Sequence, residues 1–79
     1  MEHKVIRQTL RSAENNGINT IKHNLGFEAR FVTVAPANTQ DDWFHSVPFR
    51  PKKGLENSHV EILVSEDIVN AKISIIASA

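Results

Sequence analysis

Apolar residues recur at helical spacing near the start of the chain. They are Ile6, Leu10 and Ala13, and a separate stripe of the same segment holds Lys4, Arg7 and Arg11. Gly17 follows where a helix often ends, because glycine readily adopts the left-handed conformation of a C-terminal cap. The pattern predicts an amphipathic helix over residues 4–16. A second helical turn over residues 18–25, with Asn19 as its N-cap, is an alternative to an irregular connection.

The spacing changes to a period of two after residue 26. The first alternating segment covers residues 27–35, with one face formed by Phe27, Ala29, Phe31 and Thr33. It predicts a strand that ends at Pro36. Two further alternating runs lie within residues 58–79, on either side of a polar turn. They predict two strands joined as a hairpin.

The second run of this hairpin lacks the usual protection of an edge strand. Residues 71–79 contain one charge, on Lys72, and no proline. Charges and prolines normally keep the free N–H and C=O groups of an edge strand from pairing with another chain. Unless this strand lies inside the sheet, we expect it to pair with its own copy in a homodimer about a two-fold axis.

Residues 36–57 contain all the prolines of the chain together with its only tryptophan. A threonine and an acidic residue within residues 39–42 have the spacing of a capping box and predict one helical turn. A short strand is expected around residues 47–49. Aromatic and arginine side chains dominate binding energy, and proline restricts a loop before it docks. We therefore predict that this segment binds a partner through Trp43, Phe44, Phe49, Arg50, Lys52 and Lys53.

The composition is that of a small neutral domain. The 79 residues predict a single domain, 1–79, and the nine basic and nine acidic side chains cancel. The chain has no cysteine, which excludes disulfides and fits a cytoplasmic protein. No apolar run is long enough to cross a membrane, and charges stand where a signal peptide needs an apolar core. The short apolar runs and the neutral charge give no reason to expect a membrane partner. The glycines are too far apart for a phosphate-binding loop, so we expect no cofactor.

Histidines are the candidates for catalysis. Residues 41–46 hold two carboxylates, His45 and Ser46, but partners in nucleophilic catalysis usually converge from separate elements of a fold. His45 and His59 are of the type that serves as general acid and base in a small ribonuclease or another hydrolase. The histidines form no closely spaced pair that would predict a zinc site. We assign no catalytic and no metal-binding residue from the sequence.

Nucleic-acid binding is an alternative function. The predicted helix has a basic stripe, and residues 49–54 form a basic loop close to the aromatic residues, a combination that single-strand binding uses. Asp41 and Asp42 offset two charges of this loop, and the chain is neutral. A helix-turn-helix over residues 5–25 would leave its second helix too short for a groove. These features weigh against a nucleic-acid partner.

The patterns together predict an α+β fold, in which one N-terminal amphipathic helix covers a small antiparallel sheet of three to four strands. The predicted function is non-catalytic binding of a protein or a small ligand. The protein would act as an inhibitor, an adaptor or a ligand-sequestering accessory protein of the kind that phages and mobile elements encode. The alternatives are nucleic-acid binding through the basic stripe and residues 49–54, and hydrolysis through His45 and His59.

Overall fold

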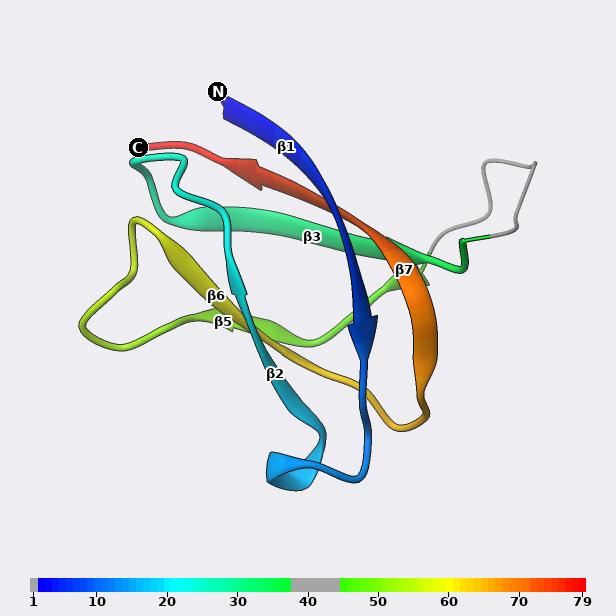
Figure 1. The fold of residues 1–79 in the computed structure, drawn as a ribbon. Helices are drawn as coiled ribbons and strands as arrows, with labels where there is room; N and C mark the ends of the chain where they lie inside the picture. The colour runs from blue at the N-terminus through cyan, green and yellow to red at the C-terminus, as the bar shows by residue number, and fades with distance from the viewer. Residues whose placement is uncertain (1, 38–44) are drawn as a thin grey trace.

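The structure, a computed structural model, describes residues 2–37 and 45–79, which form two antiparallel sheets packed face to face (Figure 1). The strands are β1 (Glu2–Leu10), β2 (Ile18–Lys22), β3 (Ala29–Ala35), β4 (His45–Ser46), β5 (Phe49–Pro51), β6 (His59–Leu63) and β7 (Ile68–Ala77). One sheet has the strand order β1-β7-β3-β4, and the other has the order β2-β6-β5. The α+β prediction is therefore wrong, because the regular structure of the described residues consists of strands and one short 3-10 turn.

The predicted N-terminal helix over residues 4–16 is wrong, because strand β1 occupies its first half. Ile6 and Leu10 stand four residues apart, a spacing that fits one face of a helix and one face of a strand. Both belong to the core, and Leu10 has no exposed surface. Ile6 lies opposite Ile73 in the antiparallel pairing of β1 with β7. The described residues contain one helical segment, the 3-10 turn η1 (Asn15–Gly17), and no helix long and apolar enough to cross a membrane.

The turn from β1 to β2 requires left-handed backbone at three consecutive residues. Asn15, Asn16 and Gly17 have φ values of 48°, 56° and 82°, which asparagine and glycine tolerate better than other residues. The Gly17 carbonyl accepts a hydrogen bond from Val64 N at 2.9 Å. A Cβ atom at Gly17 would collide with the Val64 carbonyl oxygen. The turn therefore packs directly on the backbone that follows β6.

The alternative of a second helix over residues 18–25 is excluded by strand β2, which pairs with β6. Asn19, the expected N-cap, instead bonds to the backbone that follows β1. Its Oδ1 accepts from Arg11 N and its Nδ2 donates to Arg11 O, both at 3.0 Å. Because β1 and β2 are both extended, a helix-turn-helix over residues 5–25 is excluded as well.

The predicted strand over residues 27–35 is confirmed as β3, which begins at Ala29. The register of β3 on β7 shifts between Ala29 and Phe31, and a bulge of this kind re-aims the side chains beside it. Val32 and Val34 are buried, whereas Phe31 is 63% exposed. The alternation of the sequence therefore identifies the strand but not the face on which Phe31 lies.

The two C-terminal runs are strands, as predicted, but they do not form a hairpin. β6 lies between β2 and β5 in one sheet, and β7 lies between β1 and β3 in the other. The polar turn between them carries the chain from one sheet to the other. Because β7 has a neighbour on each side, the open edge expected at residues 71–79 does not exist. The homodimer stays a prediction without that edge as its basis.

The expected short strand at residues 47–49 is displaced. β5 begins at Phe49 and pairs with β6, and β4 adds a two-residue pairing to β3. The helical turn predicted within residues 39–42 lies outside the described residues.

The core between the two sheets is aliphatic. β6 contributes Val60 and Ile62, and β7 contributes Ile73 and Ile75, all without exposed surface. Side chains alternate between the two faces of a strand. The residue between Val60 and Ile62, and the residue between Ile73 and Ile75, therefore point out of the sandwich. Burying each such side chain contributes about 1.5–3 kcal/mol. The fold thus leaves two outer faces, one on each sheet, where function can be sought.

Candidate functional site

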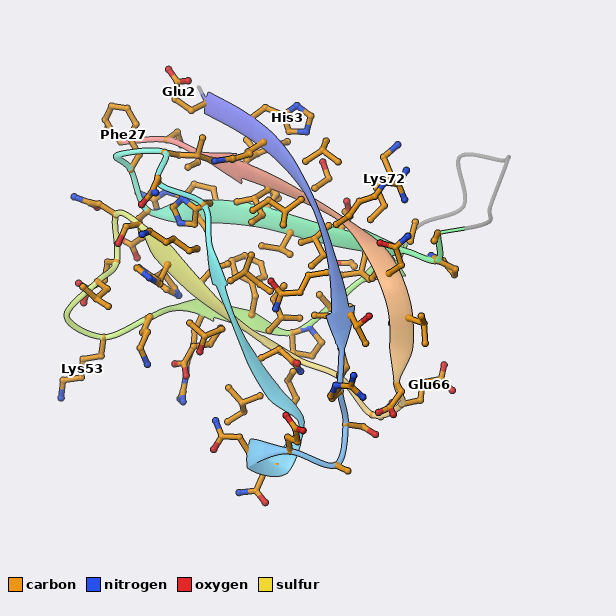
Figure 2. All side chains as sticks on the ribbon, viewed as in Figure 1. Glu2, His3, Phe27, Lys53, Glu66 and Lys72 are labelled. Atoms are coloured by element: carbon orange, nitrogen blue, oxygen red, sulfur yellow. The ribbon has the colours of Figure 1, made fainter. Side chains whose placement is uncertain are left out.

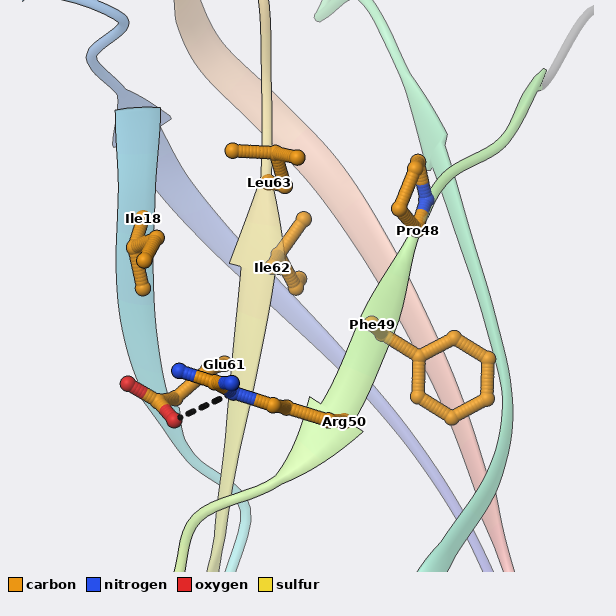
Figure 3. A pocket seen from close by; sticks show the side chains of 7 residues that line it. All are labelled: Ile18, Pro48, Phe49, Arg50, Glu61, Ile62 and Leu63. Carbon is orange, nitrogen blue, oxygen red and sulfur yellow. Dashed lines mark hydrogen bonds and ion pairs between the residues drawn. The ribbon is translucent and has the colours of Figure 1, made fainter. Parts of the chain in front are cut away.

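The outer face of the three-stranded sheet has an apolar hollow of about 210 Å³. We call it the β2–β6–β5 hollow, and its lining residues are Ile18, Pro48, Phe49, Arg50, Glu61, Ile62 and Leu63 (Figure 3). Ile18 lies opposite Leu63 in the pairing of β2 with β6. The Leu63 N–H donates to the Pro48 carbonyl at 3.0 Å. These two contacts bring apolar side chains from β2, β6 and the start of β5 to one place.

Two prolines shape the β5 side of the hollow. Pro48 precedes β5 and Pro51 ends it, and the ring of proline fixes φ near −65°. β5 is an edge strand, where the missing N–H of proline is tolerated. The Phe49 ring packs against the core and points away from Arg50 (Figure 3). Arg50 is therefore held on the outer face of the sheet.

An ion pair forms the polar side of the hollow. Arg50 lies opposite Glu61 in the register of β5 on β6, and its Nε donates to Glu61 Oε1 at 3.0 Å. The Glu61 side chain is 15% exposed and the Arg50 side chain is 69% exposed. Within the described residues Arg50 makes this hydrogen bond through Nε, which leaves its Nη groups facing solvent. A planar guanidinium with free Nη groups suits a carboxylate from a partner.

The predicted binding residues have different positions in the structure. Phe49 and Arg50 line the hollow. Lys52 is half-buried and Lys53 is exposed, both in the turn after β5 and neither in the hollow lining. Trp43 and Phe44 lie outside the described residues.

Sequence analysis missed Ile18 and Leu63. Both are apolar residues in alternating segments, so a general signal was present. Their proximity depends on the pairing of β2 with β6, which follows from the sheet topology. No local pattern in the sequence specifies that pairing.

The basic loop over residues 49–54 forms a hydrogen bond to an acidic side chain. Gly54 N donates to Glu56 Oε2 at 3.0 Å. Hydrogen bonds from the backbone N–H groups of Glu56 and of Gly54 hold the pKa of the Glu56 carboxyl below its ordinary value. Leu55 N donates to the Lys52 carbonyl at 2.9 Å. The loop is a closed turn with an ionised carboxylate beside its lysines, so it is less basic than the run of residues suggests.

The basic residues considered for nucleic-acid binding do not gather on one side. Arg7 lies on β1 in the four-stranded sheet, and Arg50 lies on β5 in the three-stranded sheet. Lys4 Nζ donates to the His23 carbonyl at 3.1 Å. This bond directs the Lys4 ammonium toward the segment after β2. The basic helix stripe expected from the sequence is therefore absent from the fold.

The histidines considered for catalysis are also separate from the hollow. His59 Nδ1 lies 2.6 Å from Ser58 Oγ, its neighbour in the chain, and His59 is not among the residues that line the hollow. The side chain of His45 lies outside the described part of the chain. Residues 2–37 and 45–79 contain no group of three or more histidine or carboxylate side chains placed to hold a metal ion.

His23 is a buried polar residue that sequence analysis did not single out. It stands two positions after Ile21, and both side chains are buried on the same side of the sheet. His23 Nδ1 accepts a hydrogen bond from Leu25 N at 3.1 Å, and its Nε2 has no hydrogen-bond partner among the described residues. Burial lowers the pKa of His23, and the nearby His59 and Lys4 lower it further. The ring is therefore uncharged in the folded protein at neutral pH.

Comparison with protein families, curated proteins and solved structures finds no match to this chain. The β2–β6–β5 hollow and its ion pair are therefore the basis for assigning a function.

Proposed function

We propose that this protein is a small non-catalytic binding protein that holds a short segment of a partner protein on the β2–β6–β5 hollow. The supporting observation is the side-by-side placement of an exposed apolar group and an exposed guanidinium. Leu63 is 46% exposed although β6 is the central strand of its sheet. A partner's apolar side chain would cover Ile18 and Leu63, while a partner's carboxylate would accept hydrogen bonds from the Nη groups of Arg50.

The size of the hollow favours a protein segment over a small ligand. Small-molecule sites usually enclose about 300–1,000 Å³, and this hollow holds about 210 Å³. That volume suits a single side chain. The two charged residues of the lining are already paired with each other. The cytoplasmic location expected from the cysteine-free composition is part of this proposal.

A displayed library of random peptides tests the proposal. Selection on the immobilised protein is expected to enrich peptides in which an apolar residue stands close to aspartate or glutamate. Leu63→Asp and Arg50→Gln should each weaken binding of an enriched peptide by about tenfold or more, measured by fluorescence anisotropy. Val69→Asp is the matched control, because Val69 is exposed on the other sheet.

Melting temperatures of the three variants establish that each is folded before binding is compared. The proposal is wrong if no peptide is enriched. It is equally wrong if the enriched peptides bind Leu63→Asp and Arg50→Gln as tightly as they bind the unmodified protein.

A further inference from the structure

The outer face of the four-stranded sheet carries residues of three different kinds, arranged in rows across β1, β7 and β3. We call it the β1–β7–β3 face. Ile73 and Ile75 are buried, so the residues that alternate with them on β7 point outward. The register of the three strands then gives three rows: His3, Ile76 and Phe31; Val5, Ser74 and Thr33; Arg7, Lys72 and Ala35. His3 Nε2 lies 2.7 Å from Ser74 Oγ, which confirms that these side chains share the face.

The first row presents an aromatic ring to solvent. Phe31 is 63% exposed, and it lies opposite β7 on one side, whereas β4 pairs with β3 at Thr33 and Val34. The ring therefore lies on the outer face of β3, where β7 is the neighbouring strand given by the described residues. Ile76, half-buried, lies opposite Phe31 in the register of β3 on β7. An exposed ring on a sheet surface is the feature on which unpaired bases stack in single-strand binding proteins.

The third row presents two positive charges, and neither forms an ion pair with another described residue. Arg7 lies directly opposite Lys72, and like charges in this position destabilise a sheet. The ion pair found within the described residues, Arg50–Glu61, belongs to the other sheet. The three rows contain no aspartate or glutamate, although the chain as a whole is neutral. Figure 2 shows His3 and Lys72 on the side of the four-stranded sheet that faces away from the other sheet.

We infer that the β1–β7–β3 face binds single-stranded nucleic acid. Phe31 stacks on a base, Arg7 and Lys72 contact phosphates, and the hydroxyls of Ser74 and Thr33 lie between them. Ala35 and Phe31 are four residues apart on β3, which places the basic row about 13 Å from the ring. The face therefore contacts a short stretch of the strand. It lies on the opposite side of the sandwich from the β2–β6–β5 hollow, so the two surfaces can be tested independently.

A protein partner fits this face less well. The centres of protein interfaces are depleted of charged residues, whereas Arg7 and Lys72 lie within the β1–β7–β3 face without an ion pair to another described residue. Phosphates supply the negative charge that this face lacks. A duplex fits less well than a single strand, because its stacked bases do not offer a free face to Phe31.

Fluorescence anisotropy with a labelled oligothymidylate of about ten nucleotides tests the inference. The full chain is titrated to about 0.1 mM at salt concentrations between about 50 and 200 mM. We expect measurable binding that weakens with salt, and weaker binding of the matched duplex. Phe31→Ala should lower the affinity about tenfold or more. Lys72→Gln should lower it and also reduce the slope of log K against log salt by about 0.7.

Two variants in the turn between β5 and β6, away from the β1–β7–β3 face, provide matched controls. Lys53→Gln removes an exposed positive charge and Leu55→Ala shortens an exposed apolar side chain, and both should bind the oligonucleotide like the unmodified protein. Thermal melting confirms that all four variants are folded. The inference is overturned if the oligonucleotide does not bind, if duplex binds as tightly, or if Phe31→Ala and Lys72→Gln have no more effect than the controls. It is also overturned if the face instead binds a protein and no nucleic acid.

Discussion

The buried histidine of this sandwich should make its stability depend on pH. Protonating His23 would place a charge in the core near Lys4 and His59, and would put an N–H where Nδ1 now accepts from Leu25 N. The folded chain therefore takes up this proton at lower pH than the unfolded chain, whose histidine titrates near pH 6.5. Below about pH 6.5 the unfolded state binds more protons, so the free energy of unfolding falls as pH falls.

The size of the effect follows from proton linkage. One proton gives at most about 1.4 kcal/mol per pH unit. The contribution of His23 is fully present above about pH 6.5 and is lost progressively on acidification, down to the lowered pKa of the folded state. For a small domain with a stability of about 5 kcal/mol, the loss over a single pH unit is easily measured.

Urea unfolding at about pH 7.5, 6.5 and 5.5 measures this dependence. The test variant is His23→Asn, because asparagine keeps an acceptor for Leu25 N–H and does not titrate. The control is His3→Asn, since His3 lies on the exposed outer face of β1. We expect the unmodified protein and His3→Asn to lose up to about 1.4 kcal/mol between pH 6.5 and 5.5. His23→Asn should lose little in that range, whatever its overall stability.

An unchanged pH dependence in His23→Asn would refute this reasoning. It would show that the ring is charged or solvated in the folded protein, contrary to its complete burial. If the stability of His3→Asn no longer depended on pH, His3 and not His23 would be the histidine responsible for the effect.

Two further predictions concern stability. Leu10→Ala should lower the free energy of unfolding by about 2–5 kcal/mol, because Leu10 is fully buried. Val69→Ala, at an exposed site, should change it by about 0.5 kcal/mol or less. Equal urea midpoints for the two variants would contradict the assignment of Leu10 to the core. Gly17→Ala should destabilise far more than Gly54→Ala, since both glycines have positive φ but only at Gly17 would a Cβ meet backbone, at the Val64 carbonyl. Similar melting temperatures for these two variants would show that strain, and not the close approach, determines the cost.

The start of the chain shows why part of the fold could not be predicted from the sequence. Lys4 and Gln8 lie on the same face of β1 as Ile6, because they alternate with it and pair with core positions of β7. β1 is an edge strand, and its inward positions are not fully buried: Lys4 is exposed and Gln8 is half-buried. The strand therefore shows no clean alternation. The apolar pattern of this segment then consists of Ile6 and Leu10, whose spacing also fits one face of a helix.

The C-terminal strands show the opposite situation. Val60, Ile62, Ile73 and Ile75 were recognised as strand residues, and all four are buried in the core. The error concerned pairing, because a short polar turn can join two strands of one sheet or carry the chain between two sheets. Alternation within each strand is the same in both cases. The periodicity of the sequence therefore does not specify which strands pair with each other.

The residues of the candidate site were predictable only in part, because some of them come together through strand pairing. The sequence predicts Arg50 as a binding residue because arginine side chains dominate binding energy and its segment is restrained by prolines, and Arg50 lines the hollow. Ile18 and Leu63 complete that hollow through the pairing of β2 with β6. Phe31 was assigned to a face by simple alternation, and the bulge after Ala29 changed its surroundings. Residues that depend on pairing or on irregular register were the ones missed.

The position of β7 in its sheet determines the order in which the chain can fold. β7 is the last strand in sequence and pairs with both β1 and β3, which are far from it in the chain. During synthesis, β1 and β3 leave the ribosome before β7, the strand that pairs with both of them. The four-stranded sheet therefore assembles only after residues 68–77 have been synthesised. Contacts of such long range make folding slow, and until it is complete the nascent chain exposes unpaired strands that chaperones recognise.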